Sequence, residues 1–173
     1  MVVVTISGPS GSGKSTVARL IAKELKLPVH SAGTFFREKA KEKNMDIKDF
    51  MEIAPKSLHK EADHSIDLAS KKGNVMIEGR LSGFMASKAD LRVYVTAPLE
   101  VRAKRTMDRH QLSLKEAKER LKERDEVDKK NYLKLYNIDV DDLYIYDLSI
   151  NTQHFDAEET AKLILTAVKL AGF

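Results

Sequence analysis

The chain has 173 residues, of which 42% are hydrophobic and 32% are charged, and its formal net charge is +4. This length suits one domain with a single core, and the absence of cysteine excludes disulfides, thiol nucleophiles and cysteine-ligated zinc. No apolar run approaches the ~18 residues that cross a bilayer, and the apolar run from Val2 leaves no room for a signal peptide. We therefore expect a cytoplasmic, monomeric protein without a membrane partner.

The first predicted elements are a buried strand over residues 2–6 and a helix over residues 14–25. The segment between them matches the phosphate-loop pattern G-x-x-x-x-G-K-[ST] in full. Such a turn points backbone N–H groups and the positive end of the helix dipole at one anion. Lys14 is expected to meet the β- and γ-phosphates, and Ser15 to bind Mg²⁺. We predict that the triphosphate contacts Gly8, Pro9, Ser10, Gly11, Ser12, Gly13, Lys14, Ser15 and Thr16.

Further along the chain, short apolar runs alternate with helical patterns. The strands are expected at residues 27–30, 75–77, 91–95 and 144–150, and the helical segments at 35–43, 46–71, 99–109, 113–134 and 156–170. Strands that alternate with helices build a parallel sheet covered on both faces. The prediction is an α/β fold of three layers with a five-stranded parallel sheet, in which ligands bind at the carboxyl ends of the strands.

Arginines follow successive strand ends. Arg37 comes after the second predicted strand and Arg80 after the third, and the charged helices carry Arg102, Arg105, Arg109, Arg120 and Arg124. Phosphoryl transfer must gather two anionic groups, and guanidinium groups hold phosphates with bidentate geometry. A surface salt bridge is the better explanation of each arginine taken alone, whereas the clustering of the set after successive strand ends favours a functional role. The basic helices are also compatible with nucleic-acid binding, although we expect no nucleic-acid partner.

The segment after the strand at 75–77 distinguishes between classes of phosphate-loop protein. A single acid, Glu78, follows this strand, and it is a candidate Mg²⁺ ligand. The alternatives are that Glu78 caps a helix or pairs with Arg80. No N-K-x-D motif of the type that reads guanine is present, which argues against a GTPase.

Four stretches of the sequence resemble the cytidylate kinases, in particular their archaeal-type branch, within the nucleoside monophosphate kinase family of P-loop NTPases. These stretches are Ser31 to Arg37, Glu78 to Gly83, Arg120 to Asp128, and Asp147 to Thr152. The resemblance implies a core at 1–30, 67–102 and 131–173, a monophosphate-binding insertion at about 31–66, and a lid at about 103–130. It implies transfer of the ATP γ-phosphoryl group, with Mg²⁺, to CMP and also to dCMP.

The resemblance also implies roles for individual residues. Catalysis would fall to Lys14, Arg102, Arg105 and Arg124, and Thr152 would border the adenine. CMP would contact Ser31, Gly33, Arg37, Gly79, Arg80, Ser82, Arg124 and Asp128, and Ser15 and Glu78 would hold the metal.

One departure concerns recognition of the base. Bacterial family members have an aspartate that helps to read cytosine where this chain has Leu81. The group that reads the base is therefore open among Ser31, Ser82, Asp63 and Asp67. The alternative functions are another small-molecule kinase of the adenylate, uridylate or shikimate type, and a nucleotide-gated nucleic-acid-binding protein.

Overall fold

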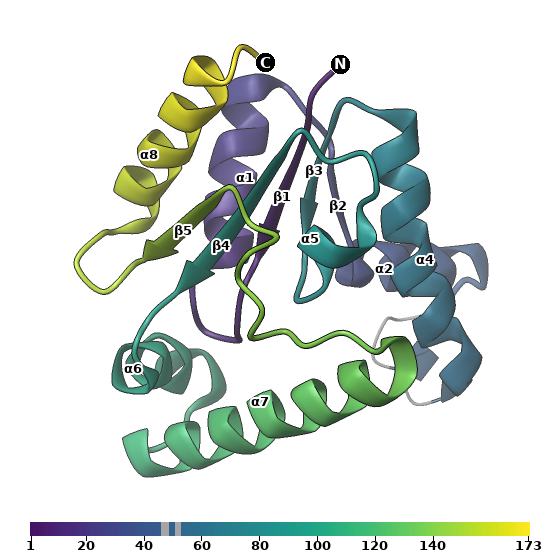
Figure 1. The fold of residues 1–173 in the computed structure, drawn as a ribbon. Helices are drawn as coiled ribbons and strands as arrows, with labels where there is room; N and C mark the ends of the chain where they lie inside the picture. The colour runs from purple at the N-terminus through teal and green to yellow at the C-terminus, as the bar shows by residue number, and fades with distance from the viewer. Residues whose placement is uncertain (46–48, 51–52) are drawn as a thin grey trace.

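A five-stranded parallel sheet lies at the centre of the computed structural model, which describes residues 1–45, 49–50 and 53–173 (Figure 1). The side chains of residues 56, 59 and 108–110 are outside this description. The strand order is β2-β3-β1-β4-β5, and every neighbouring pair is parallel. The strands are β1 Val3–Ser7, β2 Val29–Ser31, β3 Val75–Glu78, β4 Leu91–Thr96 and β5 Leu148–Asn151. The predicted fold class is confirmed.

Helices cover both faces of this sheet. They are α1 Lys14–Leu25, α2 Ala32–Glu42, α4 Lys56–Lys72, α5 Ser82–Met85, α6 Leu99–His110, α7 Leu114–Tyr136 and α8 Ala157–Leu170. Figure 1 shows α1 and α8 on one face and α4 and α5 on the other, while α7 passes below the ends of the strands. None of the helices in the described ranges combines the length and apolar character that a bilayer crossing requires.

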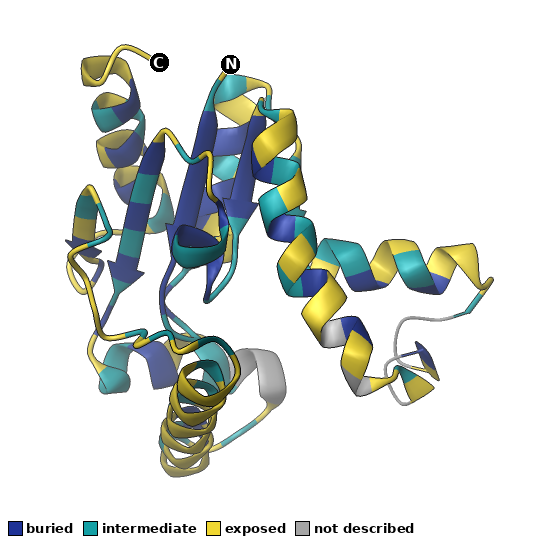
Figure 2. Cartoon of the chain, turned by 45° about the vertical axis from the view of Figure 1, so that its right-hand side comes forward, coloured by how far each residue is buried: buried dark blue, intermediate teal, exposed yellow. Residues whose placement is uncertain are grey.

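β1 is the most deeply buried part of the sheet. All five of its residues are buried, because helices pack on both of its faces (Figure 2). Alternate side chains point to opposite faces, so Val4 and Ile6 join a core with α1 and α8. Val3 joins a second cluster with α4 and the segment around α5. The buried core thereby holds the loop that follows β1 at the carboxyl edge of the sheet.

Two smaller apolar clusters lie away from the central core. Phe36, Ala40, Phe50, Leu58 and Ala62 pack together between α2, α4 and the segment that connects them. Ala103 of α6 packs against Ala117 and Leu121 of α7. The α2–α4 region and the α6–α7 hairpin therefore each have packing of their own.

Two predicted strand boundaries were wrong. β2 begins at Val29 rather than at residue 27, because Leu27 still closes the end of α1 through a hydrogen bond from its N–H to the Ala22 carbonyl. β5 begins at Leu148 rather than at residue 144, because turns occupy the preceding segment and Tyr144 is fully exposed. Residues 46–48 and 51–52 of the predicted helical stretch at 46–71 lie outside the described residues.

Candidate functional site

The phosphate loop from Gly8 to Ser15 joins β1 to α1. Gly8 has φ 145°, and a Cβ atom there would lie 2.0 Å from the Val95 carbonyl oxygen, so only glycine fits. Gly13 precedes α1 with φ 96°, and no side chain caps this helix end and no acid stands in its first turn. The positive end of α1 is therefore available to an anion.

Lys14 lies at the centre of the site. It is partly buried, and its Nζ donates a hydrogen bond to the Pro9 carbonyl at 3.1 Å. Burial lowers the pKa of Lys14 from 10.5 to about 8; Glu78 and Asp125 oppose this shift, and the charges of Arg80 and Arg124 add to it. The positive charges of Lys14, Arg80 and Arg124 beside the loop favour the binding of an anion.

Ser15 and Glu78 meet beside Lys14. The Ser15 hydroxyl donates to Glu78 Oε2 at 3.1 Å. Glu78 ends β3 and stands opposite Ile6 of β1 in the sheet register, so the fold brings the two predicted metal ligands together. Hydroxyl and carboxylate oxygens are the donors that Mg²⁺ prefers, and this pair therefore fits the ion.

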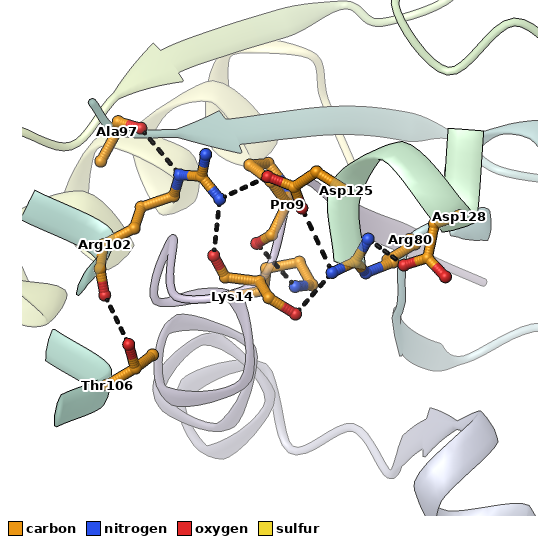
Figure 3. A network of polar contacts seen from close by, with 9 residues as sticks. Pro9, Lys14, Arg80, Ala97, Arg102, Thr106, Asp125 and Asp128 are labelled. Atoms are coloured by element: carbon orange, nitrogen blue, oxygen red, sulfur yellow. Dashed lines mark hydrogen bonds and ion pairs between the residues drawn. The ribbon is translucent and has the colours of Figure 1, made fainter. Parts of the chain in front are cut away.

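Two arginines from different elements hold the tip of the loop (Figure 3). Arg80, just after β3, donates to the Ser10 hydroxyl at 2.6 Å. Arg102 of α6 donates to the Ser10 carbonyl at 3.0 Å and, through Nε, to the Ala97 carbonyl at 3.1 Å. These two guanidinium groups therefore converge on the phosphate loop.

Carboxylates of α7 face the same two arginines. Asp125 lies 2.8 Å from Arg102 Nη1 and 3.4 Å from Arg80 Nη2, and Asp128 forms an ion pair with the other end of the Arg80 guanidinium. Asp125 belongs to the stretch from Arg120 to Asp128 that carries the family resemblance, but the sequence assigned it no role. The i, i+3 spacing of Asp125 and Asp128 on one helix was the available signal. The ion pairs of these two aspartates link α7 to the arginines at the loop tip (Figure 3).

A cavity of about 670 Å³ opens on one side of the loop. The loop, the start of α1 and the segment from Thr152 to Glu159 line it, together with Arg105. Arg105 donates to the Thr152 hydroxyl at 2.9 Å and to its carbonyl at 2.7 Å. Thr152 and Arg105 thus lie together at the wall of this cavity, which we call the first cavity.

A second cavity of about 320 Å³ lies against Gly8 and Pro9. Its wall includes Arg80 and Arg102 from the core and a stretch of α7 that contains Asp128 and Tyr132. The phosphate loop therefore has a cavity on each of two sides, and Lys14 lines the first one.

The other predicted acceptor residues are spread more widely. Arg37 is exposed on α2, where its guanidinium lies beside Gly33. Arg124 is exposed on α7, yet it is near enough to Lys14 to lower the pKa of that lysine. Arg120 is exposed on α7, and the Arg109 side chain lies outside the described part of α6. Gly79 follows β3 directly and precedes Arg80.

Ser31 and Ser82 have local roles that the sequence prediction did not include. Ser31 caps α2, and its hydroxyl accepts from the Thr34 N–H at 3.1 Å. Ser82 is fully buried and its hydroxyl lies 2.9 Å from both the Ser7 hydroxyl and the Ile6 carbonyl. Both hydroxyls thus stabilise turns at the strand ends.

The chain is similar to proteins of known family. The model of the cytidylate kinase-like family matches residues 3–154. The chain is 42% identical over 170 residues to a cytidylate kinase of Pyrococcus horikoshii, which covers 96% of this chain and 88% of that protein. It is 42% identical over 172 residues to a cytidylate kinase of Archaeoglobus fulgidus, with 96% and 94% covered.

Solved structures resemble the fold at low sequence identity. An uncharacterized protein from Eubacterium ventriosum superposes with a TM-score of 0.74 at 20% identity, over 98% of this chain and 99% of that one. A shikimate kinase from Acinetobacter baumannii gives a TM-score of 0.65 at 16% identity, over 100% and 96%. These similarities concern the fold alone.

Proposed function

Because the chain belongs to the cytidylate kinase-like family, we infer that it transfers the γ-phosphoryl group of ATP to the 5′-phosphate of CMP, and also of dCMP. The observation that carries this proposal is the position of Arg80 and Lys14 around one phosphate loop that has a cavity on either side. One cavity suits a donor nucleotide, and the other brings guanidinium groups to an acceptor phosphate.

The first cavity is proposed as the ATP site. The phosphate loop from Gly8 to Thr16 would hold the triphosphate through its N–H groups and Lys14. The adenine would lie near Thr152, which the contact with Arg105 fixes in place. Arg105 would also approach the phosphates, since it lines the same cavity as Lys14.

Ser15 and Glu78 are the residues proposed to hold Mg²⁺. Bound with the nucleotide, the ion would offset negative charge on the β- and γ-phosphate oxygens. The hydrogen bond between Ser15 and Glu78 keeps two oxygen ligands adjacent, which supports this assignment.

The acceptor phosphate is proposed to bind Arg80, with Arg37 and Arg124 approaching from α2 and α7. Residues 31–66 would then act as the monophosphate-binding insertion and residues 103–130 as the lid, with the remaining segments as the core. The separate apolar clusters of these two regions are compatible with their moving as units. Gly79, Gly33 and Asp128 complete the proposed acceptor site.

Alignment and electrostatics would supply most of the catalysis. The acceptor phosphate is already anionic, so its attack needs no general base. Lys14, Arg102, Arg105 and Arg124 would neutralise the charge that spreads over the transferring group. Closure of the α6–α7 hairpin would exclude water and so prevent hydrolysis of ATP.

An acceptor panel tests the proposal. The rate of ATP consumption is measured with CMP, dCMP, UMP, AMP and shikimate in turn, and the phosphorylated product is identified. We expect the highest kcat/KM with CMP and substantial activity with dCMP. A preference for AMP or shikimate would replace this proposal with a different kinase activity. We also propose that the protein acts as a monomer and without a nucleic-acid partner.

A further inference from the structure

Four polar side chains near the acceptor side could contact the base of the nucleotide: Ser31, Asp63, Asp67 and Ser82. The structure distinguishes between them by what each already contacts. The hydroxyls of Ser31 and Ser82 are buried and hold turns through the contacts described above.

The carboxylate of Asp67 is bound by Ser87 and Lys71. Its Oδ1 accepts hydrogen bonds from the N–H of Ser87 at 3.2 Å and from the Ser87 hydroxyl at 2.5 Å, and its Oδ2 pairs with Lys71 at 2.7 Å. The bonds from Lys71 and Ser87 lower the pKa of Asp67 to about 2. This carboxylate therefore fastens α4 to the segment after α5.

Asp63 lies one turn earlier on α4 and reaches α7 instead. The Tyr136 hydroxyl donates to Asp63 Oδ2 at 2.7 Å, across 73 positions of sequence. This bond connects the α2–α4 region to the far end of the helix whose aspartates contact Arg80. Figure 1 shows the carboxyl end of α7 approaching α4.

Two tyrosines of α7, Tyr132 and Tyr136, connect Asp63 with the second cavity. Tyr132 lines the second cavity together with Arg80. Its pKa rises to about 12 through burial and the charge of Asp128, with Arg80 opposing and Asp63 contributing. Tyr132 lies one helical turn before Tyr136 on α7, so the residue that lines the second cavity and the residue that binds Asp63 lie on the same side of that helix.

We propose that Asp63 reads the base of the acceptor nucleotide by accepting a hydrogen bond from the 4-amino group of cytosine, and that Tyr136 is a positioning residue for this carboxylate. The inference rests on the proposed function, because it assigns a specificity contact within that acceptor site. A carboxylate accepts hydrogen bonds from the cytosine amino group, whereas uracil presents a carbonyl oxygen at the same position. Asp63 therefore favours CMP and disfavours UMP.

The variant Asp63→Asn tests this assignment. The amide can still accept the Tyr136 bond, but it has lost the negative charge that repels the uracil carbonyl. We expect the ratio of kcat/KM for CMP to kcat/KM for UMP to fall by about tenfold to a hundredfold. Asp67→Asn is the matched control, one turn along the same helix, and should leave this ratio unchanged.

Tyr136→Phe provides a second variant that keeps the carboxylate. Removal of the phenol hydroxyl should lower the CMP/UMP ratio by less than Asp63→Asn does, mainly through a higher KM for CMP. A purely structural role would reduce the two substrates' kcat/KM equally and leave the ratio as in the unmodified protein.

The outcomes separate this inference from the proposed function. If the unmodified protein prefers CMP and both Asp63→Asn and Tyr136→Phe keep that preference, the assignment of Asp63 is overturned while the kinase activity stands. If the unmodified protein does not phosphorylate CMP, the proposed function itself fails. A selective loss of the CMP preference in Asp63→Asn, with Asp67→Asn unaffected, supports the assignment.

Discussion

Replacing Asp125 with asparagine removes the one negative charge that Arg80 and Arg102 share. The side chains of the two arginines are 14% and 11% exposed, and that of Asp125 is 28% exposed. Arg80 would keep its ion pair with Asp128, and Arg102 would keep its bonds to the carbonyls of Ser10 and Ala97. The variant thus leaves both guanidinium groups in place with less compensation for their charge.

The cost of this change lies between two known limits. Exposed ion pairs contribute about 0–1 kcal/mol, and breaking a fully buried pair costs about 3–5 kcal/mol. Because Asp125 is only partly buried and each arginine retains other partners, we expect Asp125→Asn to lower the free energy of unfolding by about 1–3 kcal/mol. We also expect a lower kcat, since both arginines hold Ser10 at the tip of the phosphate loop.

Urea unfolding at neutral pH measures the free energy of unfolding, and steady-state kinetics with ATP and CMP measures kcat. Glu123→Gln is the matched control, because Glu123 is an exposed acid two residues earlier on α7. Salt screens exposed pairs more than buried ones, so the loss in Asp125→Asn should persist at high ionic strength. A loss equal to that of Glu123→Gln, or one that vanishes in high salt, would refute this reasoning.

Three further perturbations probe the rest of the site. Burial gives Lys14 a pKa of about 8, and the negative charge of bound phosphates raises that pKa again. ATP binding above pH 8 should therefore take up a proton, and the affinity for ATP should fall as the pH rises. Calorimetry at pH 9 in buffers of different ionisation enthalpy measures the proton uptake, and its absence would contradict this prediction. Glu78→Gln should raise the Mg²⁺ concentration required for half-maximal rate by about tenfold or more, and an unchanged Mg²⁺ titration would remove Glu78 from the metal site. Arg37→Ala should raise KM for CMP by roughly tenfold to a hundredfold through loss of a charge-assisted contact, while KM for ATP stays the same; an unchanged KM for CMP would remove Arg37 from the acceptor site.

Much of the fold could be predicted because its signals are local. The phosphate-loop glycines and the short apolar runs specify where strands end and helices begin, and they led to the correct sheet. The residues at 144–150 imitate a strand by their alternation, yet Tyr146 packs against Phe84 and Tyr94 instead of extending β5. Such ring packing depends on tertiary contacts that a local pattern does not contain.

The site was partly predictable for a related reason. Glu78 ends β3 and Arg80 lies two residues beyond it, so the topology alone brings them to the phosphate loop. Asp125 and Tyr136 lie on a charged helix, where a solvated face and a buried ion pair have the same pattern of residues. Only the placement of α7 against the loop tip and α4 distinguishes the two.

The most direct measurement compares CMP with cytidine as acceptors, with the nucleotide products separated and identified. If Lys14 and Arg80 hold two phosphate groups next to each other, the 5′-phosphate of the acceptor is indispensable. The protein should then convert CMP to CDP at the expense of ATP and leave cytidine unchanged. Phosphorylation of cytidine as fast as CMP, or hydrolysis of ATP without formation of CDP, would contradict the account.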